Sequence, residues 1–149
     1  MIAPTVSRVP LQTSEAVNEQ IRRQTEDRIA CMAAGGSEAI ERRLAELDRE
    51  WDVERFLEAN AASLTLLSVL LGAAANRKWF LLPAVIGGFL LQHAIQGWCP
   101  PVPIIRRLGF RTQFEIEQER YALKVLRGDF RDLPRGDEQV PATLKAVGF

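Results

Sequence analysis

The chain has 149 residues, of which 47% are hydrophobic and 26% are charged, and its 19 basic and 19 acidic residues cancel. A net charge of zero argues against a general nucleic-acid-binding protein, which carries a surplus of Lys and Arg. Two cysteines, Cys31 and Cys99, exclude a disulfide framework, and their 68-residue separation excludes a CxxC redox or zinc motif.

The N-terminal arm, residues 1–58, is predicted to be helical. Val17, Ile21 and Ile29 form an apolar stripe that predicts a helix over residues 12–34. Ser37 is expected to be the N-cap of a second helix. The apolar seam of this second helix comprises Ile40, Leu44, Leu47 and Trp51. Because no residue breaks the pattern afterwards, the sequence predicts one uninterrupted helix from about 37 to 75.

Two uncharged runs predict a transmembrane helical hairpin at 59–99, with spans at about 59–76 and 79–98. The 18 residues of the first run would form a helix about 27 Å long, close to the hydrocarbon thickness of a bilayer. Trp79 and Trp98 would lie about 28 Å apart along a helix, a spacing that suits two interfacial aromatic belts. A soluble helical bundle is the alternative.

The distribution of Lys and Arg predicts the orientation of this hairpin. Nine basic residues fall in the 20 residues before the first span and the 20 residues after residue 105, whereas the loop has only Arg77 and Lys78. By the positive-inside rule, both termini are expected to be cytoplasmic.

Residues 100–127 are predicted to comprise an interfacial segment and a cytoplasmic helix. Pro100, Pro101 and Pro103 are expected to end the second span. The following segment mixes apolar and basic side chains, so its arginines are expected to lie near lipid headgroups; they are Arg106, Arg107 and Arg111.

A capping box, Thr112-x-x-Glu115, predicts the start of the cytoplasmic helix, which is expected to reach about Arg127 and to stop at Gly128. Its apolar face is expected to comprise Phe114, Tyr121 and Val125. Residues 128–149 are rich in Asp, Arg, Pro and Gly and predict a flexible tail.

Several polar or small residues within the spans are candidates for helix packing or for a functional site. Polar groups in a membrane are costly, which singles out Gln92, His93 and Gln96. Hydrogen bonds between helices are the favoured interpretation, and a ligand or proton role is the alternative. The small residues Ser68, Gly72, Gly87 and Gly88 would allow close approach of helices.

Cys99 is the candidate reactive thiol. At the boundary of the second span it is expected to be exposed enough to react, with Arg106 and Arg107 nearby in sequence to favour a thiolate. The alternative is that the thiol packs under Trp98. The chain has only one His and does not offer enough ligands for a metal site, so neither a metal nor a cofactor is expected.

The element Gly97-Trp98-Cys99-Pro100, followed by Leu108-Gly109, resembles the YgaP-like inner-membrane transmembrane domain family, small bacterial proteins of mostly unknown function. The resemblance covers roughly residues 58–110 and includes Asn60 at the start of the first span. It implies an all-α protein in the bacterial inner membrane, built on a two-helix hairpin that tends to dimerise. Some members carry a rhodanese sulfurtransferase domain, but the helical arms of this chain offer no such domain.

Together these patterns predict a non-enzymatic two-span protein with helical cytoplasmic arms. The hairpin would anchor the protein among membrane lipids and dimerise it, and the arms would engage other membrane or cytoplasmic proteins. The alternative function is a membrane component of sulfur or thiol traffic, or of redox sensing, that uses Cys99.

Overall fold

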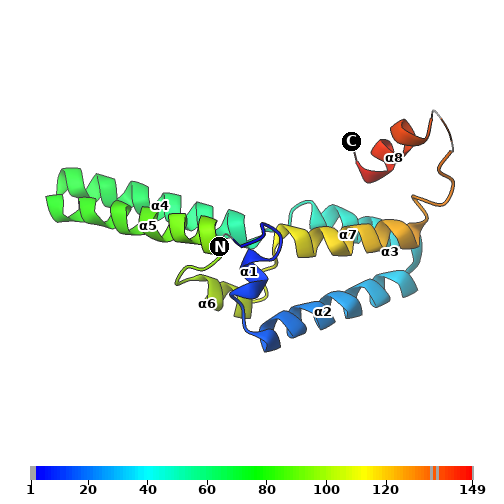
Figure 1. Ribbon diagram of the computed structural model, residues 1–149, viewed down its shortest axis with the longest axis horizontal. Coiled ribbons are helices and arrows are strands. Elements are labelled where there is room, and N and C mark those ends of the chain that lie inside the picture. Colours follow the sequence, from blue (N-terminus) through cyan, green and yellow to red (C-terminus); the bar gives the residue numbers. More distant parts are fainter. Residues whose placement is uncertain (1–2, 135, 137, 149) are drawn as a thin grey trace. The chain divides into compact units, whose positions relative to one another are not determined.

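The computed structural model describes residues 3–134, 136 and 138–148, and within them the protein is helical, without strands. Figure 1 shows the elements in chain order. They are α1 (Arg8–Leu11), α2 (Glu15–Ala34), α3 (Gly36–Leu47), α4 (Val53–Ala74), the 3₁₀ helix η1 (Arg77–Phe80), α5 (Leu81–Gln96), α6 (Val102–Arg107), α7 (Gln113–Arg127) and α8 (Gln139–Val147).

The chain divides into two compact units. The first, here called the hairpin unit, comprises Met1–Arg22 and Trp51–Phe114 and contains α1, α4, η1, α5 and α6. The second, here called the arm unit, comprises Arg23–Glu50 and Glu115–Phe149 and contains α3, most of α7 and α8. Each unit has its own cluster of buried apolar side chains.

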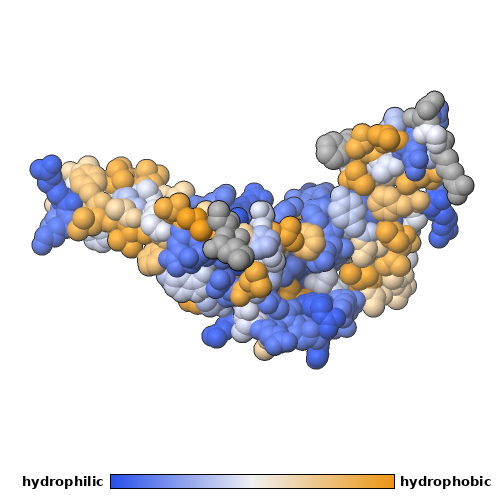
Figure 2. Space-filling view, viewed as in Figure 1, coloured by the Kyte–Doolittle hydropathy of each residue, from blue (hydrophilic) through white to orange (hydrophobic). Residues whose placement is uncertain are grey.

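In the hairpin unit, α4 and α5 lie side by side and are joined through η1 (Figure 1). The stretches Val53–Ala74 and Arg77–Gln96 are both long and apolar enough to cross a membrane. Most of their side chains are not buried within the protein, unlike those of a core helix in a soluble fold. Figure 2 shows the apolar side chains that cover this pair, with hydrophilic atoms at the end where the two helices join.

The predicted uninterrupted helix over 37–75 is wrong, because α3 ends at Leu47 and α4 begins only at Val53. The interruption has a local cause: the Asp52 side chain accepts a 2.7 Å hydrogen bond from the backbone N–H of Arg55 and caps a new helix. Trp51 therefore lies outside both helices and is exposed instead of extending the apolar seam of α3.

The small residues of the two spans differ in their surroundings. Ser68 is buried, and a Cβ atom added at Gly72 would lie 2.9 Å from the Phe80 ring, so the absence of a side chain at Gly72 allows that ring to pack closely. A Cβ atom at Gly87 or Gly88 would meet no atom within 4 Å. The first pair thus serves packing within the chain, whereas the second pair faces outwards.

The terminal end of the α4–α5 pair rests on a small apolar core. Its buried members are Val9, Val53, Leu57, Cys99, Val102 and Ile105. Phe56 and Phe110 pack against this core with their ring centroids 4.6 Å apart. α5 ends at Gln96, where Gly97 caps it with a left-handed φ of 79°, so the helix stops before the prolines that the sequence predicts as its end. Pro101 and Pro103 instead lie at the start of α6.

The arginines expected at the lipid headgroups lie in different environments. Arg106 and Arg111 are buried, so the prediction of headgroup contacts is wrong for both. The Arg106 guanidinium donates hydrogen bonds to the Asn18 side chain at 2.9 Å and to the backbone carbonyl of Phe110 at 3.0 Å. These acceptors pair donors of the buried guanidinium within the protein. Arg107 is exposed, beside the exposed apolar residues Ile104 and Leu108.

In the arm unit, α3 and α7 form the core. The buried residues are Ile40, Leu44 and Leu47 from α3 and Ile116 and Leu123 from α7. α7 spans Gln113–Arg127 and Gly128 follows it with φ of 97°, so the predicted helix and its stop are confirmed. Its predicted apolar face is wrong, because Phe114, Tyr121 and Val125 are exposed and Ile116, Glu119 and Leu123 are buried.

Two further local expectations for the arm unit are corrected. Ser37 is not the N-cap of α3, since Gly36 adopts φ of 77° and the helix already begins there. The expected flexible tail contains α8, and the Lys124 ammonium donates a 3.0 Å hydrogen bond to the carbonyl of Ala146 near its end. The parts of the expected tail at 135, 137 and 149 lie outside the described residues.

Candidate functional site

The hairpin unit brings four side chains with acid–base or nucleophilic chemistry together at the terminal end of the α4–α5 pair. We call Arg8, Glu54, His93 and Cys99 the junction cluster. Arg8 is the first residue of α1, Glu54 lies in the first turn of α4, His93 lies in the last turn of α5, and Cys99 follows α5. The cluster thus draws on residues up to 91 positions apart in the sequence.

Glu54 lies between the two basic members of the junction cluster. Its Oε2 atom is 2.8 Å from Nε2 of His93, and its Oε1 atom accepts a 2.8 Å hydrogen bond from Nη2 of Arg8. Only 5% of the His93 side chain is exposed, against 31% of Glu54. The carboxylate therefore fixes a buried imidazole on one side and holds α1 on the other.

The two ring nitrogens of His93 differ in their surroundings. Because a carboxylate can only accept, Nε2 is the protonated nitrogen, which leaves a lone pair on Nδ1 of the neutral imidazole. Nδ1 is buried and has no hydrogen-bond partner among the described residues. Cys99 follows six residues later and is buried in the same unit. A thiol, an imidazole and an orienting carboxylate are the components of an activated nucleophile.

The surroundings of Cys99 differ from those expected from its sequence position. The residue is only 3% exposed, so the expectation of an exposed thiol is wrong. Prolines after Cys99 turn the chain back into α6, and Cys99 packs in the apolar core beside Val102 and Ile105. Arg106, which is near Cys99 in the sequence, donates its hydrogen bonds to Asn18 and to the carbonyl of Phe110.

Gly97 controls how closely α1 approaches this site. A Cβ atom added there would lie 2.3 Å from the backbone oxygen of Arg8, a distance that no side chain tolerates. Since Gly97 also adopts φ of 79°, glycine is required for both its conformation and its packing. The Gly97-Trp98-Cys99-Pro100 element therefore supplies both the docking point of Arg8 and the thiol.

An apolar cavity of about 400 Å³ lies between α4 and α5, and Cys99 is the member of the junction cluster that lines it. Its walls include Leu64, Val85, Phe89 and Leu90, and Cys99 lies at its terminal end together with Pro100 and Pro101. Asn60 is the other polar residue of the lining, and its amide donates a 2.7 Å hydrogen bond to the carbonyl of Phe56. The volume falls within the range of small-molecule sites, about 300–1,000 Å³.

The other polar residues singled out in the second span do not join the cluster. Gln92 is half-buried and Gln96 is exposed. Sequence reasoning found His93 and Cys99 but missed Glu54 and Arg8. The sequence does contain a signal for Glu54. This residue lies just before the first uncharged run, and antiparallel spans place the start of the first span beside the end of the second span, where His93 lies.

Among residues 3–134, 136 and 138–148, no group of three His, Cys, Asp or Glu side chains is arranged to hold a metal ion. The side chains of the junction cluster can themselves offer proton transfer at the imidazole and nucleophilic attack by the thiol.

The arm unit carries a second concentration of charge, around Glu119. This carboxylate is fully buried and accepts a 2.8 Å hydrogen bond from Nε of Arg43. Burial lowers the pKa of Arg43, but its hydrogen bonds to Glu119 and Glu46 outweigh that effect and hold the pKa above its ordinary value. Arg43 therefore remains charged, and its hydrogen bond to Glu119 joins α3 to α7.

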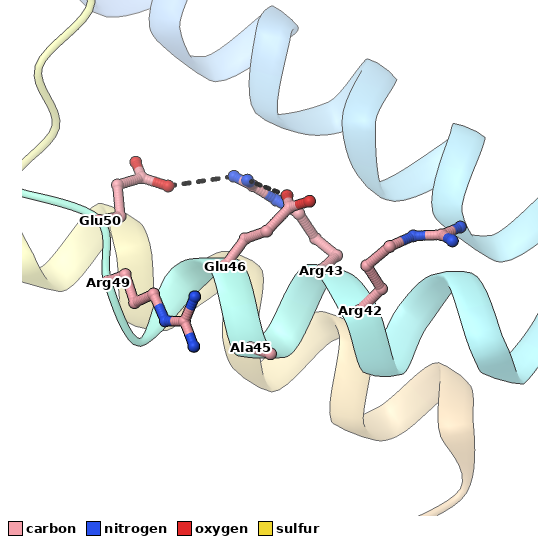
Figure 3. A pocket seen from close by; sticks show the side chains of 6 residues that line it. All are labelled: Arg42, Arg43, Ala45, Glu46, Arg49 and Glu50. Carbon is pink, nitrogen blue, oxygen red and sulfur yellow. Dashed lines mark hydrogen bonds and ion pairs between the residues drawn. The ribbon is translucent and has the colours of Figure 1, made fainter.

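A shallow hollow of about 470 Å³ lies on the outer face of α3 (Figure 3). Arg42, Arg43 and Arg49 line it together with Glu46 and Glu50, and Arg43 pairs with both carboxylates at 3.0 and 3.1 Å. Since the acidic partners belong to the same wall, the hollow is a mixed-charge surface that offers no concentrated positive field to an anion.

Comparison of the chain with protein-family models, with curated proteins and with solved structures found no match.

Proposed function

We propose that the protein is a two-span protein of the bacterial inner membrane that is not an enzyme, and that its hairpin anchors and dimerises it while its helical arms engage partner proteins. The observation that carries the proposal is the exposure of large apolar side chains along α4 and α5, among them Leu66, Leu81 and Leu91. In water such a surface is unfavourable, whereas lipid chains cover it without cost.

The location of charge supports the proposed orientation. Nine Lys and Arg residues flank the terminal ends of the spans, and Arg77 and Lys78 lie in the short connection. Both termini, the junction cluster and the arm unit would therefore be cytoplasmic. The resemblance of residues 58–110 to the YgaP-like inner-membrane domain supports the same assignment. Arg107, Ile104 and Leu108 would lie in the interface, because they are exposed side by side on α6.

The outward-facing glycines support dimerisation through α5. Gly87 and Gly88 leave open space on a face that also exposes Leu91, and small residues at such positions let two helices approach closely. The partner chemistry that fits is a second copy of α5, with its own pair of glycines opposite.

Disulfide crosslinking in native membranes tests this proposal. In a variant without the native thiols, Cys31→Ser with Cys99→Ser, the added substitution Leu91→Cys is expected to give a crosslinked dimer, and a further Gly88→Ile is expected to abolish it. The matched control is Leu70→Cys on α4, which is similarly exposed and is expected to crosslink far less. A monomer at Leu91→Cys, or equal crosslinking at both positions, would contradict dimerisation through α5.

A second candidate function is favoured by one specific observation: the hairpin unit buries the Cys99 thiol together with an imidazole, His93, that the Glu54 carboxylate orients. We propose thiol chemistry at Cys99, in which the thiol carries a sulfur-linked group or senses an oxidant. Its test compares the rates at which Cys99 and Cys31 react with iodoacetamide in the membrane-bound protein. The oriented imidazole predicts that His93→Gln slows the reaction of Cys99 and leaves that of the exposed Cys31 unchanged.

A further inference from the structure

We propose that Cys99 accepts a long-chain acyl group from an acyl thioester, and that the chain of this group occupies the cavity between α4 and α5. The inference rests on the thiol chemistry proposed above and names its substrate class. It is carried by the geometry of the hairpin unit: Cys99 lines an apolar cavity, and the same unit holds a buried imidazole, His93, whose Nδ1 has no partner among the described residues and whose Nε2 lies 2.8 Å from Glu54.

The cavity selects the kind of substrate. Its lining is apolar apart from Asn60 and Cys99, and the amide of Asn60 is already bonded to the backbone of its own helix. A polar small molecule would lose its hydration there without gaining hydrogen bonds, whereas an alkyl chain loses nothing. Because the cavity lies between the two apolar helices, a chain could enter from the lipid side while the thiol remains shielded from water.

The cluster supplies the groups that acyl transfer requires. Nδ1 of His93 is buried and has no hydrogen-bond partner among the described residues, so its lone pair is available for a proton. Glu54 at 2.8 Å stabilises the imidazolium that results, and Arg8 holds the carboxylate from the other side. A base held in this way contributes typically about 10²–10⁴-fold to such a reaction.

The chemical step balances without an oxidant or reductant. The thiol proton of Cys99 passes to Nδ1 of His93, and the sulfur attacks the carbonyl carbon of the donor thioester. A new carbon–sulfur bond forms at Cys99, the carbon–sulfur bond of the donor breaks, and the leaving thiolate takes the proton from the imidazole. One thioester is exchanged for another, and the acyl chain remains attached in the cavity.

The test incubates the full chain in lipid nanodiscs with palmitoyl-coenzyme A and measures the mass of the denatured protein. We expect an increase of one palmitoyl group that hydroxylamine removes. Cys99→Ser is expected to abolish it, and Cys31→Ser, the matched control on an exposed thiol, is expected to retain it. His93→Gln is expected to slow the transfer at least 10-fold.

A second pair of measurements separates a chain-binding cavity from a merely reactive thiol. Val85→Trp, which fills the cavity, is expected to suppress transfer from palmitoyl-coenzyme A but to spare transfer from acetyl-coenzyme A. Equal loss with both donors, labelling of Cys31 alone, or a lipid that leaves on denaturation would overturn the proposal. If Cys99 reacts with iodoacetamide in a His93-dependent way but not with palmitoyl-coenzyme A, the proposed thiol chemistry is supported and the proposed acylation is contradicted. If Cys99 reacts with neither reagent, both proposals are contradicted.

Discussion

The two units each contain a pair of packed helices, and the two pairs distribute their side chains in opposite ways. Between α3 and α7 lie Ile and Leu side chains and the pair that Arg43 forms with the buried Glu119, while the other arginines and glutamates of the two helices lie mainly on the outside. Between α4 and α5 the small residues Ser68 and Gly72 are buried, while Leu, Val and Phe cover the outside. The difference indicates which solvent suits each pair: the first arrangement is stable in water and the second in lipid.

The largest expected effect comes from a charge placed on the outer surface of each pair. Leu66 of α4 is 62% exposed and Val125 of α7 is 61% exposed, so neither substitution by Arg disturbs packing. Leu66→Arg is expected to cost roughly 3 kcal/mol of membrane insertion, because an arginine in mid-span must enter hydrocarbon. Carbonate extraction of membranes should release a large share of this variant, while Val125→Arg remains in the membrane fraction.

The next effect concerns the inside of the arm unit. Leu123 is fully buried, so Leu123→Ala is expected to lower the free energy of unfolding of this unit by about 3 kcal/mol through lost burial and a cavity. Val125→Ala, two residues along on the exposed face, should change it by less than about 0.5 kcal/mol. Amide hydrogen exchange of α7 in the full chain measures both; equal losses of protection would mean that the buried face is misassigned.

A smaller effect is expected where α1 meets the hairpin. Gly97→Ala forces a Cβ atom against the backbone of Arg8, whereas Gly109→Ala, at another left-handed position, meets open space. Both variants incur the conformational cost of a left-handed alanine, and Gly97→Ala adds overpacking of about 2 kcal/mol. Thermal unfolding in detergent should rank the variants in that order. Identical stabilities would show that α1 does not dock at Gly97.

The smallest effect is a pH dependence at the end of α7. Bidentate hydrogen bonds from Arg127 lower the pKa of Asp129 below its ordinary value of 3.8. A lowered carboxyl pKa stabilises the folded state above pH 3.8, and this contribution disappears as the pH falls through the lower folded value. Asp129→Asn should therefore cost about 0.5 kcal/mol near neutral pH and nothing in strong acid, as measured by amide exchange.

Local patterns in the sequence predict much of this fold. The apolar stripe of α2, the seam of α3 and the Gly128 stop depend on neighbours within a few residues, and each of these elements is found in the structure. The break at 48–52 also has a local cause, the N-cap Asp52. Because no Gly or Pro accompanies Asp52, the sequence pattern nevertheless predicts a continuous helix. The prediction chose the wrong face of α7 as the buried one. The true buried face includes a charged residue, Glu119, whose burial depends on a hydrogen bond from Arg43 of α3.

The candidate site could be predicted only in part. Cys99 and His93 are visible in the sequence as reactive residue types in an apolar run, but the partner that orients His93 is not. Glu54 lies 39 residues before His93, and the pairing depends on the register between α4 and α5. Arg106 was expected at the surface because arginines usually lie there; its burial depends on Asn18, 88 residues away.

The most direct test of the membrane arrangement is the labelling of single cysteines with a membrane-impermeant maleimide in intact cells. In the Cys31→Ser, Cys99→Ser background, Lys78→Cys lies between the two apolar helices and Arg49→Cys lies in the arm unit. The two-span arrangement with cytoplasmic termini predicts that Lys78→Cys is labelled from outside the membrane and that Arg49→Cys is labelled only after the cells are permeabilised. Labelling of both variants only after permeabilisation would contradict it.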